Sequence, residues 1–290
     1  MNFKYSVIFD ALAMMGLDVF GEPREILKKI REAGFDGVDI GGDRVELKRL
    51  REIADIARSL GLEVPAILGA WAPWHAGEER DLASSDDTVR IKAVNYAKKC
   101  VDKAVELSAE VFEICVSPGV NPYPVSKVPI RVLEQNFTES AADISRYALD
   151  RNITIILEPI NRFEGYPGFM NSVVDAVRVL NMVGASNLGV LGDLFHMNIE
   201  DVSICDAIRA AGKTLRHIHL ADSNRFLPGT GHVDFKSMIR TLTEVNFTGY
   251  MSLDCVPPGP DLETYLENSM SYMTTMEKAV ELQKKMMGTP

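Results

Sequence analysis

"LRHIHLADSNRFLPGTGHVDFKSMIRTLTEVNFTGYMSLDC" (215–255) contains an apolar strand pattern, a glycine-rich loop, an amphipathic helix pattern and a second strand pattern in succession. Strand candidates that alternate with helix candidates indicate βα repeats, in which neighbouring strands run parallel. Both strand patterns are nearly continuous apolar runs, which is typical of parallel strands buried on both faces. This stretch therefore predicts an α/β fold with a parallel sheet.

The same alternation extends over the whole chain. Strand candidates lie at 5–9, 37–41, 63–69, 111–116, 153–159, 188–193, 215–221 and 249–255. Helix candidates lie at 23–33, 46–61, 87–108, 131–151, 172–184, 202–212, 235–245 and 262–286. Since no Pro/Gly/Ser-rich linker divides the chain, we expect one (β/α)8 TIM barrel over residues 1–290. A doubly wound sheet is the structural alternative, but no glycine-rich phosphate fingerprint follows the first strand.

Composition excludes several classes of protein. The 290 residues carry a net charge of −10, which argues against nucleic-acid binding because such proteins need a basic surface. The four cysteines show no CxxC spacing, which favours buried free thiols in a reducing compartment. No apolar run is long enough for a membrane span, and the first residues lack a signal-peptide core. We therefore expect a cytoplasmic protein with neither a nucleic acid nor a membrane as partner.

Acidic and histidine side chains recur at the ends of the later strand candidates. Glu158, Asp193 and Asp254 stand at the ends of the fifth, sixth and eighth strands, and the seventh carries His217 and His219. Alternate residues of a strand share a face, so both histidines point the same way, with His219 nearer the carboxyl end. In a TIM barrel the active site is built at that end of the strands.

Three carboxylates and one imidazole form an oxygen-rich metal site. Such a set suits Mn²⁺, Co²⁺ or Mg²⁺ better than a structural zinc, which favours sulfur and nitrogen. A single aspartate at a strand end is usually a helix cap or turn former, and a single buried histidine is usually a core residue. Four such residues on four successive strands favour one shared ion per chain, which would also make the buried carboxylates tolerable.

Other features carry weaker signals. Trp71 and Trp74 follow the third strand, where they could form an aromatic wall against a sugar or simply pack under the loop. The stretch "DSNRFLPGTG" (222–231) has the look of a phosphate loop, but one glycine-rich turn is weak evidence. Arg225 within it could bind an anionic or hydroxylated substrate or neutralise the acidic rim.

Four motifs together resemble one enzyme family. "EPINRFE" (158–164), "GDLFHMNIED" (192–201), "HIHLADSNRFLPGTG" (217–231) and "SLDC" (252–255) are similar to motifs of the ketose 3-epimerases. That group includes the D-tagatose, D-psicose and L-ribulose 3-epimerases of the xylose-isomerase-like TIM-barrel superfamily. The resemblance covers the whole chain as eight βα units.

The resemblance implies roles for seven residues. The expected metal ligands are Glu158, Asp193, His219 and Asp254, and the expected substrate contacts are Glu164, His196 and Arg225. The family typically uses Mn²⁺, sometimes Co²⁺ or Mg²⁺, and forms dimers or tetramers. We thus expect a homodimer or homotetramer that acts on a small keto sugar or keto sugar acid.

The implied reaction is epimerisation at C3, the carbon next to the carbonyl. A metal-chelated ketose loses the C3 proton to give a cis-enediolate, and carboxylates on both faces exchange the proton. Glu158 and Asp254 would be these two acid/base groups. An aldose–ketose isomerase of the same superfamily is the nearest alternative.

Asp254 departs from the family pattern, which has Glu at this position. Aspartate is shorter by roughly 1.3–1.5 Å, judged from ordinary C–C geometry. Metal binding tolerates that difference, whereas proton transfer can lose on the order of a hundredfold for about 1 Å of displacement. A catalytically impaired barrel that binds metal and sugar is therefore a further alternative.

Overall fold

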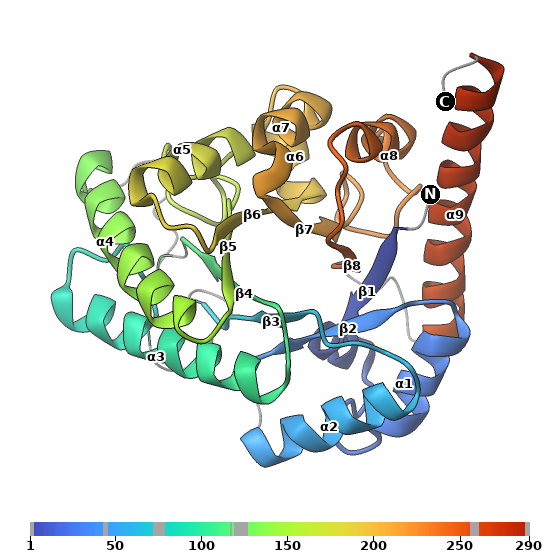
Figure 1. The fold of residues 1–290 in the computed structure, drawn as a ribbon, viewed down its shortest axis with the longest axis horizontal. Helices are drawn as coiled ribbons and strands as arrows, with labels where there is room; N and C mark the ends of the chain where they lie inside the picture. Colours follow the sequence, from blue (N-terminus) through green and yellow to red (C-terminus); the bar gives the residue numbers. More distant parts are fainter. Residues whose placement is uncertain are drawn as a thin grey trace.

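The computed structural model describes residues 3–42, 46–71, 79–116, 118, 127–255 and 261–287. Within these residues, eight parallel strands pair in chain order and β8 closes on β1 to form a barrel (Figure 1). The strands are β1 (Lys4–Ile8), β2 (Gly37–Gly41), β3 (Ala66–Leu68), β4 (Val111–Cys115), β5 (Thr154–Glu158), β6 (Leu188–Asp193), β7 (Leu215–Leu220) and β8 (Tyr250–Leu253). The closed sheet confirms the predicted TIM barrel and excludes the doubly wound sheet, which has two open edges.

Helices surround the barrel on its outer side (Figure 1). They are α1 (Pro23–Glu32), α2 (Leu47–Ser59), α3 (Asp87–Glu106), α4 (Ile130–Leu149), α5 (Val173–Val183), α6 (Leu194–Glu200), α7 (Ile204–Ala211), α8 (Phe235–Glu244) and α9 (Leu262–Met286), with short 3-10 turns η1 (Asp10–Met15) and η2 (Gly212–Thr214). Side chains at several starts accept backbone N–H groups, as Asp86 does from Thr88 and Ser172 from Asp175. None of the helices in these ranges is long and apolar enough to cross a membrane.

Two elements differ from the sequence-based expectation. Strand β3 is shorter than the predicted 63–69, because Pro65 has no N–H to donate to the ladder. Helix α6 is additional: its seven residues are too few to display a helical period, so the pattern at 194–200 does not reveal it. Its position directly after β6 matters for the site, because Asp193 is both the last strand residue and the helix cap.

The barrel interior below the carboxyl end of the strands has two unlike halves. Each residue of these two halves lies two positions before a residue that lines the cavity at the carboxyl end or is an expected metal ligand. Because alternate residues of a strand share a face, each one points to the same side of its strand as that residue. We call the buried set on β3 to β6 the apolar floor: Ala66, Val111, Ile156 and Leu191. We call the buried set on β1, β2, β7 and β8 the polar floor: Ser6, Asp39, His217 and Ser252.

Candidate metal centre and substrate pocket

A cavity of about 500 Å³ opens at the carboxyl end of the barrel. The described residues that line it include Glu158 from β5, His219 from β7 and Asp254 directly after β8. Ile8 at the end of β1 and Trp71 after β3 contribute apolar surface. The cavity thus lies where the sequence predicts the chemistry, and it has the mixed lining of a small-molecule site.

The four expected metal ligands converge at the cavity floor. Nδ1 of His219 lies 3.1 Å from Oε1 of Glu158 and 3.7 Å from Oδ2 of Asp254. Ligand atoms of Asp193, His219 and Asp254 all lie within 4.8 Å of one another, and so do those of Glu158, Asp193 and His196. The shorter carboxylate of Asp254 therefore still reaches the cluster.

Asp193 divides its carboxylate between a helix and the cluster. Oδ1 accepts the backbone N–H groups of Phe195 (2.7 Å) and His196 (3.4 Å), which caps α6. Oδ2 is buried and has no hydrogen-bond partner among the described residues. Burial and the negative charge of Asp254 raise the pKa of Asp193 to about 8. A buried oxygen left unpaired among other carboxylates fits a bound cation, so the residues suit a hard divalent metal.

His219 is the positive counterpart of these carboxylates when no ion is bound. Burial lowers the pKa of its imidazole, but Glu158, Asp254 and Asp193 outweigh that effect and raise the pKa to about 10. A metal ligand must be unprotonated at the binding nitrogen. A divalent cation would therefore replace the proton on the binding nitrogen of His219 and also the hydrogen bond that Oδ2 of Asp193 lacks.

Arg225 and Glu164 form an ion pair beside the cluster. Nη1 of Arg225 lies 3.0 Å from both carboxylate oxygens of Glu164, and Nη2 lies 3.8 Å from Oδ2 of Asp254. The guanidinium also stacks over Phe195, with Cζ 4.8 Å from the ring centroid. The arginine is thereby held rigidly at the cavity wall, where its remaining donors can face an oxygen-rich molecule.

His196 presents a neutral imidazole to the cluster. Burial, followed by the positive charge of Arg225, lowers the pKa of His196 to about 3. Nδ1 lies 2.7 Å from Nδ2 of Asn161, and an amide nitrogen can only donate, so Nδ1 accepts. The ring proton is then on Nε2, which lies 3.6 Å from Oδ2 of Asp193. His196 thus offers an N–H group toward the carboxylates of the candidate metal site.

The glycine-rich loop 222–231 binds its own carboxylate. Asp222 accepts the backbone N–H groups of Ser223 (2.7 Å), Gly229 (2.8 Å) and Val233 (3.1 Å). These donors are therefore not directed at a phosphate, and the phosphate-loop look has a structural origin. The loop instead presents Arg225, whose φ of 61° is the left-handed conformation that this turn requires.

Two carboxylates of the barrel interior escaped the sequence-based list. Glu113 on β4 accepts N–H groups from Gly69 (2.9 Å) and from the Trp71 indole (3.2 Å), and burial together with Glu158 raises its pKa to about 8. Trp71 lines the cavity and also packs edge-on against Tyr96, and its contact with a sugar stays a prediction. Trp74 lies outside the described residues.

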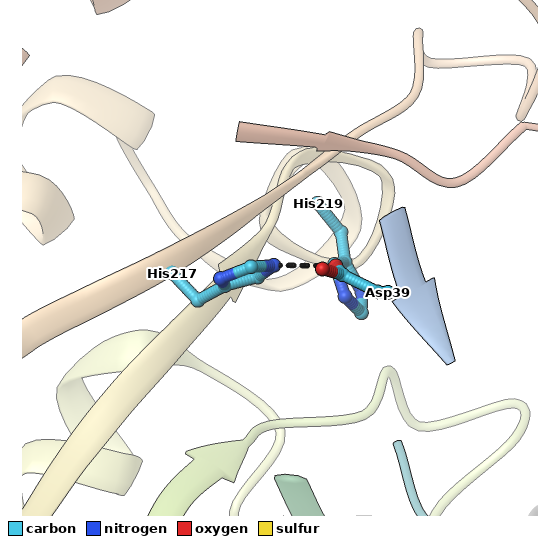
Figure 2. Close-up of side chains that lie close together, drawn as sticks. All are labelled: Asp39, His217 and His219. Atoms are coloured by element: carbon cyan, nitrogen blue, oxygen red, sulfur yellow. Dashed lines mark hydrogen bonds and ion pairs between the residues drawn. The ribbon is translucent and has the colours of Figure 1, made fainter. Parts of the chain in front are cut away.

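Asp39 on β2 is the second of these carboxylates. It pairs with His217 across the barrel, with Oδ2 2.8 Å from Nε2 of the imidazole (Figure 2). The available signal was the same in both cases: "GVDIG" (37–41) and "VFEICV" (111–116) each hold one acidic residue in an otherwise apolar strand.

Comparison with known proteins agrees with this geometry. A family model for the xylose isomerase-like TIM barrel matches residues 27–276. The chain belongs to this family. Among relatives of this xylose isomerase-like barrel, L-ribulose 3-epimerase of Methylomonas sp. (strain DH-1) is 30% identical over 80% of the chain and 77% of the relative. The 3-dehydro-D-guloside 4-epimerase of Escherichia coli (strain K12) is 25% identical over 87% of the chain and 95% of the relative.

Structural comparison shows the same fold. A solved structure of an L-ribulose 3-epimerase superposes with a TM-score of 0.85 at 20% identity, and the match covers 99% of this chain and 98% of the other. At that identity the superposition shows the shared fold. The named relatives are epimerases, which makes this xylose isomerase-like barrel an enzyme of the isomerase class. The resemblance drawn from the four sequence motifs is confirmed.

Proposed function

We propose that this chain is a divalent-metal-dependent epimerase that inverts C3, next to the carbonyl, of a free ketose or keto sugar acid. The observation that carries the proposal is the convergence of Glu158, Asp193, His219 and Asp254 on one cavity floor, with Oδ2 of Asp193 buried and unpaired among the described side chains. These residues would hold one ion, Mn²⁺ or else Co²⁺ or Mg²⁺. We expect a homodimer or homotetramer, which light scattering can test.

The names of the relatives support this reaction class. The L-ribulose and D-psicose 3-epimerases among them act at C3 of a 2-ketose, and the 3-dehydro-D-guloside 4-epimerase acts at C4 of a 3-keto sugar. In each case the inverted carbon is adjacent to a carbonyl group. Epimerisation next to a carbonyl group is therefore the best supported reaction for this chain. The position of that carbonyl in the sugar is what the substrate experiment below determines.

Two carboxylates would carry out the proton transfer. Glu158 is the last residue of β5 and Asp254 directly follows β8, and their side chains are 11% and 22% exposed. One carboxylate would take the proton from one face of the sugar, and the other would return a proton to the opposite face. A divalent cation, when bound, polarises the carbonyl and offsets the negative charge that develops on the sugar oxygens.

Neighbouring donors would orient the substrate. Arg225 is fixed by Glu164 and Phe195, and the neutral His196 is fixed by Asn161. Both donors can bind hydroxyl or carboxylate oxygens without changing their own protonation state. Preorganised donors of this kind cost no rearrangement when charge develops in the transition state.

Hydrogen exchange from D₂O tests the proposal. Ketopentoses, ketohexoses and keto sugar acids, and one 3-keto glycoside, are incubated with the Mn²⁺-loaded protein and recovered for NMR. We expect deuterium at C3 of a ketose, or at C4 of the 3-keto glycoside. Label only at C1 or C2 would identify an aldose–ketose isomerase. Binding of metal and sugar without any exchange would identify a non-catalytic barrel.

Substitution of Asp254 tests the two-base mechanism. Asp254→Asn removes one proton acceptor but keeps an oxygen for the ion, so we expect C3 exchange to fall on the order of 10²- to 10⁴-fold. Metal occupancy, measured by atomic absorption, serves as the control and should be retained. Full turnover in this variant at unchanged occupancy would contradict the assignment of Asp254.

A further inference from the structure

The polar floor lies directly next to the histidine of the metal cluster. Asp39 and His217 form a hydrogen-bonded pair with Oδ2 and Nε2 2.8 Å apart, and both side chains are almost completely buried (Figure 2). The His217 and His219 rings stand edge to face with centroids 5.5 Å apart. An oxygen of Asp39 and one ring nitrogen of each histidine all lie within 4.8 Å of one another.

Two buried atoms of this group are left unpaired. Nδ1 of His219 faces Glu158 and Asp254, whereas Nε2, on the other side of the ring, has no hydrogen-bond partner in the described part of the chain. Oδ1 of Asp39 likewise has none there. An unmade hydrogen bond of a buried polar group costs about 1–3 kcal/mol, so each of these two atoms needs a reason to be buried without a partner.

Metal binding supplies that reason. A neutral imidazole that binds an ion through Nδ1 carries its proton on Nε2, which is then the one donor of the ring. A metal-bound histidine generally donates this second N–H to a carboxylate or carbonyl, which fixes the ring orientation and strengthens the ligand. Oδ1 of Asp39 is a carboxylate oxygen that is free to accept, because His217 occupies only Oδ2.

We propose that Asp39 is a positioning residue for the metal: once an ion is bound, its Oδ1 accepts a hydrogen bond from Nε2–H of His219, while His217 holds the carboxylate in place through Oδ2. The inference rests on the metal site of the proposed function and extends it to a pair of residues that do not touch the ion. It also explains why an acidic residue stands inside the apolar strand β2.

A second ion between Asp39 and His217 is the competing interpretation. The two residues contact each other at 2.8 Å, which is a direct hydrogen bond and leaves no room for a cation between them. The geometry therefore favours a closed pair that supports one ion. The competing interpretation predicts two ions per chain.

Binding of Mn²⁺ to the metal-free protein is the first test. The dissociation constant is measured from the electron paramagnetic resonance signal of free Mn²⁺ for the wild type and Asp39→Asn. We expect binding to weaken about 10- to 100-fold in this variant. Tyr5→Phe is the matched control. It removes a different buried hydrogen bond, the 2.5 Å contact between the Tyr5 hydroxyl on β1 and Glu277, which does not involve His219. Its Mn²⁺ affinity should change by less than about twofold if the bond adds only stability.

A conservative pair of variants separates positioning from general damage. His217→Gln keeps a side-chain N–H that can reach Asp39, whereas His217→Leu has none. We expect the glutamine variant to bind Mn²⁺ within about threefold of the wild type and the leucine variant to resemble Asp39→Asn. Equal weakening by glutamine and leucine would contradict a role for the donor.

The position of the ring proton tests the wild type without any substitution. In histidine labelled with ¹⁵N, two-bond proton–nitrogen NMR of the Mg²⁺-loaded protein shows which nitrogen of His219 is protonated. We expect the proton on Nε2. A proton on Nδ1, or Mn²⁺ binding that Asp39→Asn leaves unchanged, overturns the inference but leaves the proposed function standing. Failure of the wild type to bind Mn²⁺ overturns both, and two Mn²⁺ ions per chain overturns the single-ion arrangement.

Discussion

The apolar and polar floors occupy equivalent positions in the same barrel but are stabilised differently. Ile156 and Leu191 of the apolar floor are fully buried and belong to one hydrophobic cluster. Such apolar contacts depend little on direction. Asp39 and His217 of the polar floor are equally buried but are joined by a hydrogen bond, which depends on both distance and angle. One half of the interior therefore fills space, and the other half also fixes an orientation.

The difference between the two floors corresponds to the side chains that lie above them. His219 has a ring that must present one particular nitrogen to the cluster, and it lies above the polar floor. Packing alone holds a flat ring in place but does not choose which nitrogen carries the proton. We infer that a directional floor is retained under the imidazole because a hydrogen bond makes that choice.

The largest effect should come from making the polar floor apolar on one side only. His217→Leu leaves Asp39 buried without its partner, so we expect the free energy of unfolding of the metal-free protein to fall by about 3–5 kcal/mol. Urea denaturation measures the loss. The double variant with Asp39→Leu should recover part of it, because no buried charge remains. A double variant less stable than the single one would contradict this account.

A cavity in the apolar floor should destabilise the fold without affecting the ion. Leu191→Ala removes buried methyl groups, so we expect a loss of about 2–4 kcal/mol in unfolding free energy. The Mn²⁺ dissociation constant of the folded protein should stay within about twofold of the wild type. A Mn²⁺ affinity that fell in step with stability would erase the distinction between the two floors.

Metal affinity should rise with pH. In the metal-free protein at neutral pH, Asp193, with a pKa of about 8, and His219, with a pKa of about 10, both hold protons that a cation must displace. We expect the Mn²⁺ association constant to increase about tenfold per pH unit for each proton displaced, steepest below pH 8. Calorimetry in buffers of different ionisation enthalpy counts the released protons. A pH-independent affinity would show that the ligands are already unprotonated.

The smallest effect should come from a hydroxyl of the polar floor. Ser252 lies on β8 in register with His219, and its Oγ accepts or donates no hydrogen bond within the ranges that the structure describes. We therefore expect Ser252→Ala to change the unfolding free energy by less than about 1 kcal/mol. A larger loss, measured in urea, would show that the hydroxyl belongs to the hydrogen-bonded network of Asp39.

Local sequence patterns were sufficient for the barrel and for much of the cluster. The strands follow from short apolar runs, and the convergence of Glu158, Asp193, His219 and Asp254 follows from where each run ends. Their roles as ligands stay a prediction. The short helix α6 was missed because a single cap and two turns carry no period.

Contacts across the barrel were beyond the reach of the same patterns. Asp39 and His217 are 178 positions apart, and their meeting depends on strand register and tilt, which no single segment encodes. The binding of loop amides by Asp222 depends on the folded turn in the same way. An isolated acidic residue in a buried strand signals that a partner exists, but only the closed barrel identifies it.

The divided carboxylate of Asp193 would link a bound ion to the first turn of a helix. One oxygen closes the first turn of α6 and the other faces the cluster, so a bound cation would restrain the backbone amides of Phe195 and His196 through a single side chain. Amide protons at this end of α6 should exchange with solvent more slowly once the site is loaded. The exchange rate of these amide protons would then report how long the ion stays bound, and it can be measured without any sugar.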